Sequence, residues 1–282
     1  MFRNFQFEGA KGTLTGYEWP VETPVKVMCI IHGIGEHAGR YDRMAGVLNE
    51  AGIAVLAMDL PGHGKSYGKR GQTAPRRDVF TCIDRLLEKA ETEWPGVPVV
   101  LYGHSMGGNL CLDYRSRGAK NALPEKYIVS APWLKLVLQF PTPVYALLHG
   151  AAKLMPNFQM SSGCKAEDLG NIEITRPYDT DPLVHTKITL QTAIECFDIA
   201  AELCAGTLEN NHGADGKPFL LMHGDADKIC SVEGSRMVAA QYQGDPQFTY
   251  REWPGYYHEI HNGGPEADGM EVIKTIRDFV LA

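Results

Sequence analysis

Residues 97–107 read Val-Pro-Val-Val-Leu-Tyr-Gly-His-Ser-Met-Gly, and this stretch decides the fold. The apolar run Val97–Tyr102 predicts a buried strand, and a helical pattern begins at about residue 110. The turn between them fits G-x-S-x-G, in which small residues on both sides let Ser105 sit on a tight, strained bend. Its hydroxyl would then stand at the carboxyl edge of a sheet as a nucleophile. The alternative is a serine that only caps the following helix.

Strand and helix patterns alternate on both sides of this turn. Before it, a hairpin pattern over residues 5–19 precedes strand runs at 25–31 and 53–58 and helical patterns at 44–48 and 78–94. After it come strand runs at 127–130, 219–223 and 248–253, with helical patterns at 232–242 and 269–281. This alternation predicts an α/β fold with a mostly parallel central sheet flanked by helices.

One long stretch interrupts the alternation. Between about residues 132 and 215, apolar helical patterns at Trp133–Met155 and Ile188–Leu208 flank a polar loop. Such a stretch is longer than a plain connection. We therefore expect a helical cap, residues 132–215, inserted after the sixth strand between two core segments, 1–131 and 216–282.

Composition limits the partners and the compartment. The 282 residues contain 27 Lys and Arg against 34 Asp and Glu, a net charge of −7, which argues against nucleic acid as a partner. The seven cysteines form no CxxC pair, so neither a disulfide framework nor a metal site is expected. No signal peptide and no apolar run of about 18 residues is evident. These features predict a soluble, cytoplasmic protein.

A serine nucleophile needs a base and an acid. Of the ten histidines, only His258 and His261 follow both Ser105 and an acid at a strand end. His258, in the loop after the last strand, is the predicted base, and His261 fits a local hydrogen-bond partner better. Asp225 and Asp227 compete as the acid: the spacing favours Asp227, whereas Asp225 suits a turn.

An oxyanion hole needs two N–H groups aimed at the developing negative charge. The residue after the nucleophile, Met106, would supply one. The loop after the third strand, His32-Gly33-Ile34-Gly35, would supply the other from Ile34.

Six motifs together resemble the α/β-hydrolase family and, within it, the monoglyceride lipases and bacterial lysophospholipase-like hydrolases. They are His32-Gly33-Ile34-Gly35-Glu36-His37-Ala38-Gly39-Arg40-Tyr41, Asp59-Leu60-Pro61-Gly62-His63-Gly64-Lys65-Ser66, Gly103-His104-Ser105-Met106-Gly107-Gly108, Tyr178-Asp179-Thr180-Asp181-Pro182-Leu183, Asp225-Ala226-Asp227-Lys228-Ile229-Cys230 and Tyr257-His258-Glu259-Ile260-His261. The resemblance runs over almost the whole chain. It implies that Asp227 is the acid and that Ile34 and Met106 form the oxyanion hole.

The resemblance also implies a polar pocket for a glycerol head, bordered by Glu36, Arg40, Tyr178 and His261, and a cysteine near the active site at Cys230. Each residue has a simpler alternative. Glu36 and Arg40 would make a weak surface pair, Tyr178 would pack under a turn, and Cys230 would be a buried thiol.

The implied activity is hydrolysis of a single-chain lipid ester, monoacylglycerol to glycerol and fatty acid, without metal or cofactor. The alternatives are a lysophospholipase, a short-chain carboxylesterase, or a catalytically silent hydrolase-fold protein that binds a small apolar ligand. The apolar stretch Trp133–Met155 has two interpretations. Either the cap forms an acyl tunnel and makes transient contact with a membrane or micelle surface, or the whole stretch packs on the domain beneath it.

Overall fold

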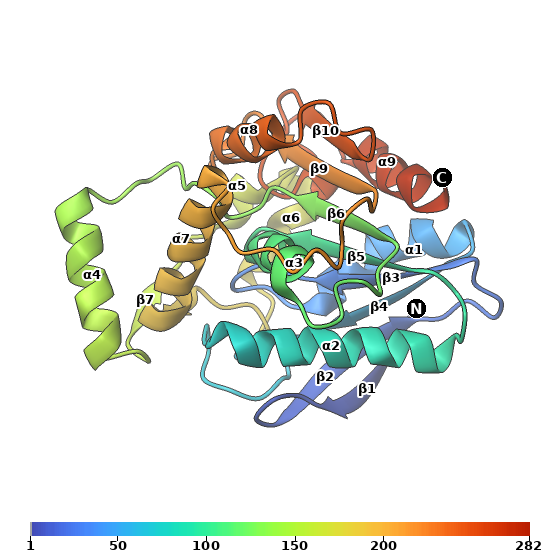
Figure 1. Ribbon diagram of the computed structural model, residues 1–282, viewed down its shortest axis with the longest axis horizontal. Coiled ribbons are helices and arrows are strands. Elements are labelled where there is room, and N and C mark those ends of the chain that lie inside the picture. Colours follow the sequence, from blue (N-terminus) through green and yellow to red (C-terminus); the bar gives the residue numbers. More distant parts are fainter. Residues whose placement is uncertain (1) are drawn as a thin grey trace.

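The computed structural model describes residues 2–282, which form an eight-stranded sheet in the order β1-β2-β4-β3-β5-β6-β9-β10 (Figure 1). The strands are β1 (Arg3–Glu8), β2 (Thr13–Trp19), β3 (Lys26–Ile31), β4 (Ile53–Met58), β5 (Val99–His104), β6 (Lys126–Ser130), β9 (Phe219–Gly224) and β10 (Phe248–Trp253). From β4 to β10 all neighbours are parallel, while β1 and β2 join antiparallel. The predicted mostly parallel α/β sheet is confirmed.

Helices cover both faces of the sheet because the buried strands are apolar on both sides. Along β3, Cys29 and Ile31 pack in one apolar core, and Met28 and Ile30 pack in the other. The first core also contains side chains from α2 (Arg76–Glu93), α3 (Met106–Arg117) and α8 (Val232–Gln241). The second contains those of α1 (Asp42–Glu50) and α9 (Met270–Leu281). Continuous apolar runs of this kind are expected where parallel strands are covered twice.

The segment between β6 and β9 holds seven further elements. These are α4 (Thr142–Leu154), β7 (Gln159–Ser161), α5 (Ala166–Leu169), α6 (Ile172–Thr175), the 3-10 turn η2 (Arg176–Asp179), β8 (Lys187–Thr189) and α7 (Leu190–Ala205). The antiparallel pair β7 and β8 corrects the expectation of helices and loop alone in this segment. Strands of three residues are too short to show an alternating pattern in the sequence.

The helix expected over Trp133–Met155 is also shorter than predicted, since it begins only at Thr142. Prolines explain the late start: Pro141 disfavours helical geometry at the residue before it, and Pro143 fits the first helical turn. The preceding residues instead follow the loop after β9, where the Val137 N–H donates to the Ile229 carbonyl at 2.9 Å.

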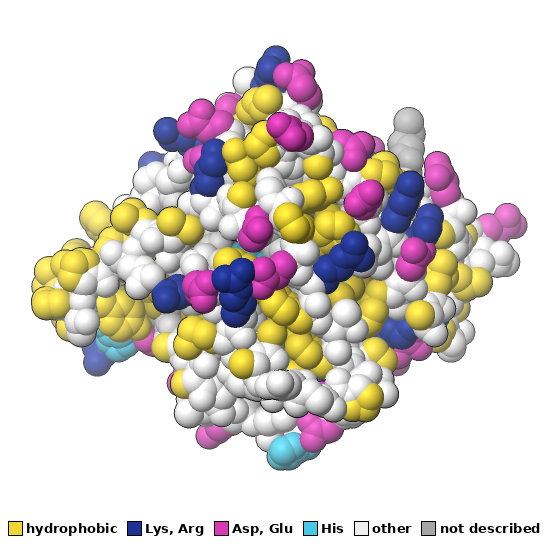
Figure 2. Space-filling model, turned by 90° about the horizontal axis from the view of Figure 1, so that it is seen from above, with side chains coloured by type: hydrophobic (Ala, Val, Ile, Leu, Met, Phe, Trp, Pro, Cys, Tyr) yellow, Lys and Arg dark blue, Asp and Glu magenta, His cyan; other side chains and the backbone are white. Residues whose placement is uncertain are grey.

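Helix α4 stands away from the core, at the left of Figure 1. None of its residues is buried, and Leu147 and Leu154 are 72% and 84% exposed. The same end of the molecule carries a cluster of hydrophobic side chains in Figure 2. Within residues 2–282, no helix has the length and apolar character needed to cross a membrane.

Candidate active site

Ser105 occupies the bend between β5 and α3, with φ 56° and ψ −120°. A non-glycine residue rarely adopts positive φ, and such strain is typical of functional sites. The flanking glycines allow the bend. A Cβ on Gly103 would lie 2.3 Å from the Gly107 carbonyl oxygen, and one on Gly107 would lie 2.1 Å from the Ile31 carbonyl oxygen. The predicted strand–turn–helix setting is therefore present.

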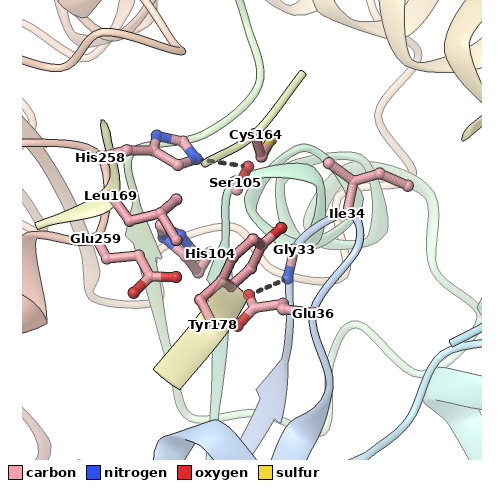
Figure 3. Close-up of a pocket in the computed structure, with 10 residues that line it drawn as sticks. All are labelled: Gly33, Ile34, Glu36, His104, Ser105, Cys164, Leu169, Tyr178, His258 and Glu259. Atoms are coloured by element: carbon pink, nitrogen blue, oxygen red, sulfur yellow. Dashed lines mark hydrogen bonds between the residues drawn. The ribbon is translucent and has the colours of Figure 1, made fainter. Parts of the chain in front are cut away.

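The structure brings Ser105, His258 and Asp227 together at the carboxyl edge of the sheet, and Figure 3 shows the contact of His258 with Ser105. His258 Nε2 lies 2.8 Å from Ser105 Oγ, and its Nδ1 lies 2.7 Å from Asp227 Oδ2. All three are buried, so these hydrogen bonds face little competition from water. Because Asp227 accepts at Nδ1, that nitrogen carries a proton, and Nε2 of the neutral ring is free to accept one from the serine.

The electrostatics of this pair suit a base. Burial alone would lower the pKa of His258, but the adjacent Asp227 carboxylate outweighs it and raises that pKa above its usual value. Burial would raise the pKa of Asp227. The charge of His258 and the hydrogen bonds from His258 and His223 prevail and hold it well below its usual range. Asp227 thus remains ionised whenever His258 changes its charge.

Asp225, the competing acid, lies apart from His258. Its side chain is exposed and accepts a hydrogen bond at 2.7 Å from the Gly255 N–H, in the turn that follows β10. The Asp227 carboxylate accepts further bonds through Oδ1 from the N–H groups of Ile229 and Cys230, at 2.7 and 2.9 Å. The structure therefore places Asp225 in the turn and Asp227 beside the imidazole.

The loop after β3 and the start of α3 present free N–H groups beside Ser105. Among the hydrogen bonds of residues 2–282, the backbone N–H groups of Ile34 and Met106 have no acceptor. The neighbouring Gly33 N–H donates to Glu36 Oε1 at 2.6 Å, which fixes the loop (Figure 3). Two unpaired donors at this position can stabilise an oxyanion.

A small polar pocket of about 10 Å³ adjoins Ser105, and Glu36, Tyr178 and Glu259 contribute to its lining. Arg40 lies behind it, where its guanidinium donates to both Glu36 and Glu259 and lies 4.8 Å from the centre of the Tyr178 ring. Burial raises the pKa of Glu36, against the influence of Arg40. The pKa of Glu259 is lowered, since Arg40 overcomes the effect of its burial.

His261 is buried but lies outside the lining of this pocket. Its ring stacks on Tyr41, with centroids 5.4 Å apart, and meets His104 edge-on at 5.4 Å. Burial lowers the pKa of His261 to about 4, although Glu259 acts in the opposite direction. The imidazole is therefore neutral at pH 7 and packs beneath the site.

A larger cavity of about 360 Å³ is also lined by Ser105 and shares Ile34 and Cys164 with the polar pocket. Its walls are mainly apolar and come from the loop after β3, the segment after β6, α7 and the loop after β9: Ile34, Trp133, Leu136, Leu138, Phe140, Met160, Ile188, Ala193, Phe197, Ile229 and Cys230. A concave apolar site with a few polar groups at one end is typical of small-molecule binding. Within residues 2–282, no cluster of three or more His, Cys, Asp or Glu side chains is arranged to hold a metal ion.

The family model described as serine aminopeptidase, S33, matches residues 22–264. The chain belongs to this family. This chain is 30% identical over 275 residues to the monoglyceride lipase of Rattus norvegicus, and the match covers 94% of this chain and 85% of that protein. It is 27% identical over 266 residues to the phospholipase YtpA of Bacillus subtilis, covering 93% and 98% of the two chains.

The fold agrees with these relatives. The crystal structure of a monoacylglycerol lipase from Paleococcus ferrophilus matches with a TM-score of 0.82 and 29% identity, covering 95% of this chain and 98% of that one. An uncharacterised abhydrolase domain-containing protein of Dictyostelium discoideum is 30% identical over 261 residues, and this chain spans 26% of its length. This chain is thus a monoglyceride-lipase-like α/β-hydrolase, as its motifs indicated.

Glu259, His104 and Cys164 line the polar pocket but were not singled out from the sequence. Glu259 directly follows the predicted base. Its cation partner, Arg40, lies far away in the sequence, so the sequence provides no reason to expect a buried ion pair there. His104 stands inside the serine motif as one of its variable positions. Cys164 lines both the polar pocket and the apolar cavity, and burial raises the pKa of its thiol to about 11. Only the position of Glu259 beside His258 offered a signal.

Proposed function

We propose that this chain hydrolyses monoacylglycerol to glycerol and a fatty acid through an acyl-enzyme. The observation that carries the proposal is the position of Ser105, which is hydrogen-bonded to His258 and lines both an apolar cavity and a polar pocket. An ester carbonyl at Ser105 would direct its acyl chain into the cavity and its alcohol toward the polar pocket.

In this mechanism, Ser105 Oγ attacks the ester carbonyl carbon while His258 Nε2 takes the hydroxyl proton. The N–H groups of Ile34 and Met106 stabilise the oxyanion of the tetrahedral intermediate. The bond to the glycerol oxygen breaks, and His258 returns its proton to that oxygen. Water then attacks the acyl-enzyme with His258 again as the base, and the fatty acid leaves. Asp227 keeps the imidazole in the required tautomer throughout.

The charge of the polar pocket favours a neutral alcohol. Glu36 and Glu259 both face it, and Arg40, the neighbouring cation, is engaged with these two carboxylates. A phosphate head group would therefore meet carboxylates and no free cation. This argues for monoacylglycerol over lysophospholipid, although the relative named phospholipase YtpA keeps the latter as the second candidate.

The glycerol head needs more room than the pocket now has. A volume of about 10 Å³ suits a single water molecule. We infer that the covering side chains, Leu169 of α5 and Tyr178 of η2, move when the substrate binds. His261 would act beneath the pocket, by supporting Tyr41 and His104, rather than by contact with glycerol.

The segment 132–215 is proposed to act as a cap between core segments 1–131 and 216–282, with α4 as its contact with lipid. Leu138, Leu147 and Leu154 are all more than two-thirds exposed, which is unusual for large apolar side chains. A micelle or membrane surface would cover them, and the mouth of the acyl cavity at Leu138 would then face the lipid.

A substrate panel tests the proposal. We expect hydrolysis of medium- and long-chain monoacylglycerols, with much weaker hydrolysis of lysophospholipids that carry the same acyl chains. Maximal activity on p-nitrophenyl esters of two to four carbons would indicate a short-chain carboxylesterase instead. Failure of a fluorophosphonate probe to label Ser105 in the folded protein would indicate a silent ligand-binding protein.

A further inference from the structure

A second histidine, His223, also contacts the carboxylate of Asp227. His223 stands near the end of β9, and its side chain is completely buried. Its Nε2 lies 3.1 Å from Asp227 Oδ2, the same oxygen that accepts from His258 Nδ1 at 2.7 Å. The imidazoles of His223 and His258 therefore share one carboxylate oxygen.

The surroundings of His223 determine where its proton lies. Besides Asp227 Oδ2, the neighbour of Nε2 is the Cys230 carbonyl oxygen at 3.0 Å, and neither oxygen can donate. Nε2 must therefore carry the hydrogen. On the other side of the ring, Nδ1 lies 2.7 Å from the hydroxyl of Ser235, a buried residue of α8. The neutral ring can accept the Ser235 proton there, so all of its hydrogen-bonding capacity is used.

We infer that His223 is a positioning residue that holds Asp227 and limits the strength of its interaction with His258. The inference rests on the proposed function, because it assumes that His258 is the base. A carboxylate oxygen that accepts two N–H bonds shares its charge between them. Without the bond from His223, Asp227 would stabilise the imidazolium of His258 more strongly, and its orientation would depend on the three remaining hydrogen bonds.

The test compares His223→Leu with His223→Gln, whose amide N–H can take the place of Nε2–H. Esterase activity is measured on a soluble p-nitrophenyl ester over a range of pH. For His223→Leu we expect kcat to fall about tenfold with KM nearly unchanged, since Asp227 keeps its other three hydrogen bonds. The acidic limb of the pH profile should move to higher pH. His223→Gln should restore most of kcat and the original profile.

Met222→Ala serves as the matched control for a general loss of stability. Met222 precedes His223 on β9 but packs in the apolar core on the opposite face of the sheet. The Met222→Ala substitution should lower the melting temperature without moving the pH profile of activity. If His223→Leu also lowers only the melting temperature, the positioning role is wrong.

Two further measurements keep the outcomes distinct. If His223→Leu does not fold, His223→Gln and Ser235→Ala test the positioning role instead. We then expect a normal pH profile for His223→Gln. For Ser235→Ala we expect a smaller shift of the acidic limb. Unchanged profiles in all soluble variants would overturn the inference. If wild-type activity does not depend on Ser105, the proposed function fails instead.

Discussion

The edge of the sheet around Ser105 and the projecting helix α4 differ in the burial and hydrogen bonding of their side chains. At the edge, Ser105, His258 and Asp227 are buried, and each has a hydrogen-bonded partner at 2.7–2.8 Å. On α4 no residue is buried. The first region fixes atoms for a reaction, while the second leaves apolar surface uncovered. Substitutions in the two regions should therefore differ in which substrates they affect.

The largest effect is expected from Ser105→Ala, which removes the nucleophile and little volume. Turnover of every ester should fall by about 10⁴-fold or more, whatever its chain length or physical state. Initial rates on a soluble ester and on monoacylglycerol micelles, together with the melting temperature, check this expectation. A variant that folds normally and retains more than a few per cent of the activity would contradict a serine nucleophile.

Asp227→Asn should reduce kcat by roughly 10³–10⁴-fold, because an amide can stabilise the wrong tautomer of His258. Asp225→Asn is the matched control, since it makes the same change two residues away. It should alter kcat less than about threefold, because Asp225 bonds only to the Gly255 N–H of a turn. The reverse order of effects would move the acid to Asp225.

The pH dependence tests the same region without a substitution. Asp227 raises the pKa of His258 above its usual value of about 6.5. Protonated His258 cannot take the proton of Ser105, so kcat/KM should be constant at alkaline pH. It should fall about tenfold per pH unit once the pH is below that raised pKa. Rates on a soluble ester from pH 5 to 9 measure this limb. Activity that persists well below pH 6 would rule out a histidine base.

The smallest effect is expected on α4. Leu147→Asp places a charge on an exposed residue outside the lining of the cavity. Activity on long-chain monoacylglycerol micelles should fall by roughly three- to tenfold, with hydrolysis of soluble esters unchanged. Leu136→Asp is the contrasting variant: Leu136 lines the cavity, so both substrates should be affected. Equal behaviour of Leu147→Asp on both substrates would remove the lipid-surface role of α4.

The sequence predicted the buried edge far better than the projecting segment, for physical reasons. Parallel strands covered on both faces must be apolar runs, and the bend at Ser105 demands glycines at fixed spacing, so both leave a local pattern. The start of α4 depends on Pro141 and on hydrogen bonds to the distant loop after β9, such as that between Val137 and Ile229. Such contacts leave no periodic pattern in the sequence.

The polar residues of the site also differ in how far the sequence could predict their contacts. Glu36 and Arg40 are four residues apart, and the sequence allowed a surface pair. The structure instead buries Glu36 and leaves the Arg40 side chain only 13% exposed, and Glu259, more than 200 residues later, adds a second carboxylate to the same guanidinium. His223 and Asp227 are likewise close in the sequence. Their contact bears on the catalytic site only because His258, from another loop, binds the same carboxylate oxygen.

The bond between Arg40 and Glu259 also concerns the order in which the chain folds. It joins residues 219 positions apart, and the bond between Ser105 and His258 joins residues 153 positions apart. Closing such long loops is slow compared with forming helices and local hairpins. During refolding from denaturant, esterase activity should return after most of the helical signal. Recovered activity would then report that the first and last portions of the chain have met.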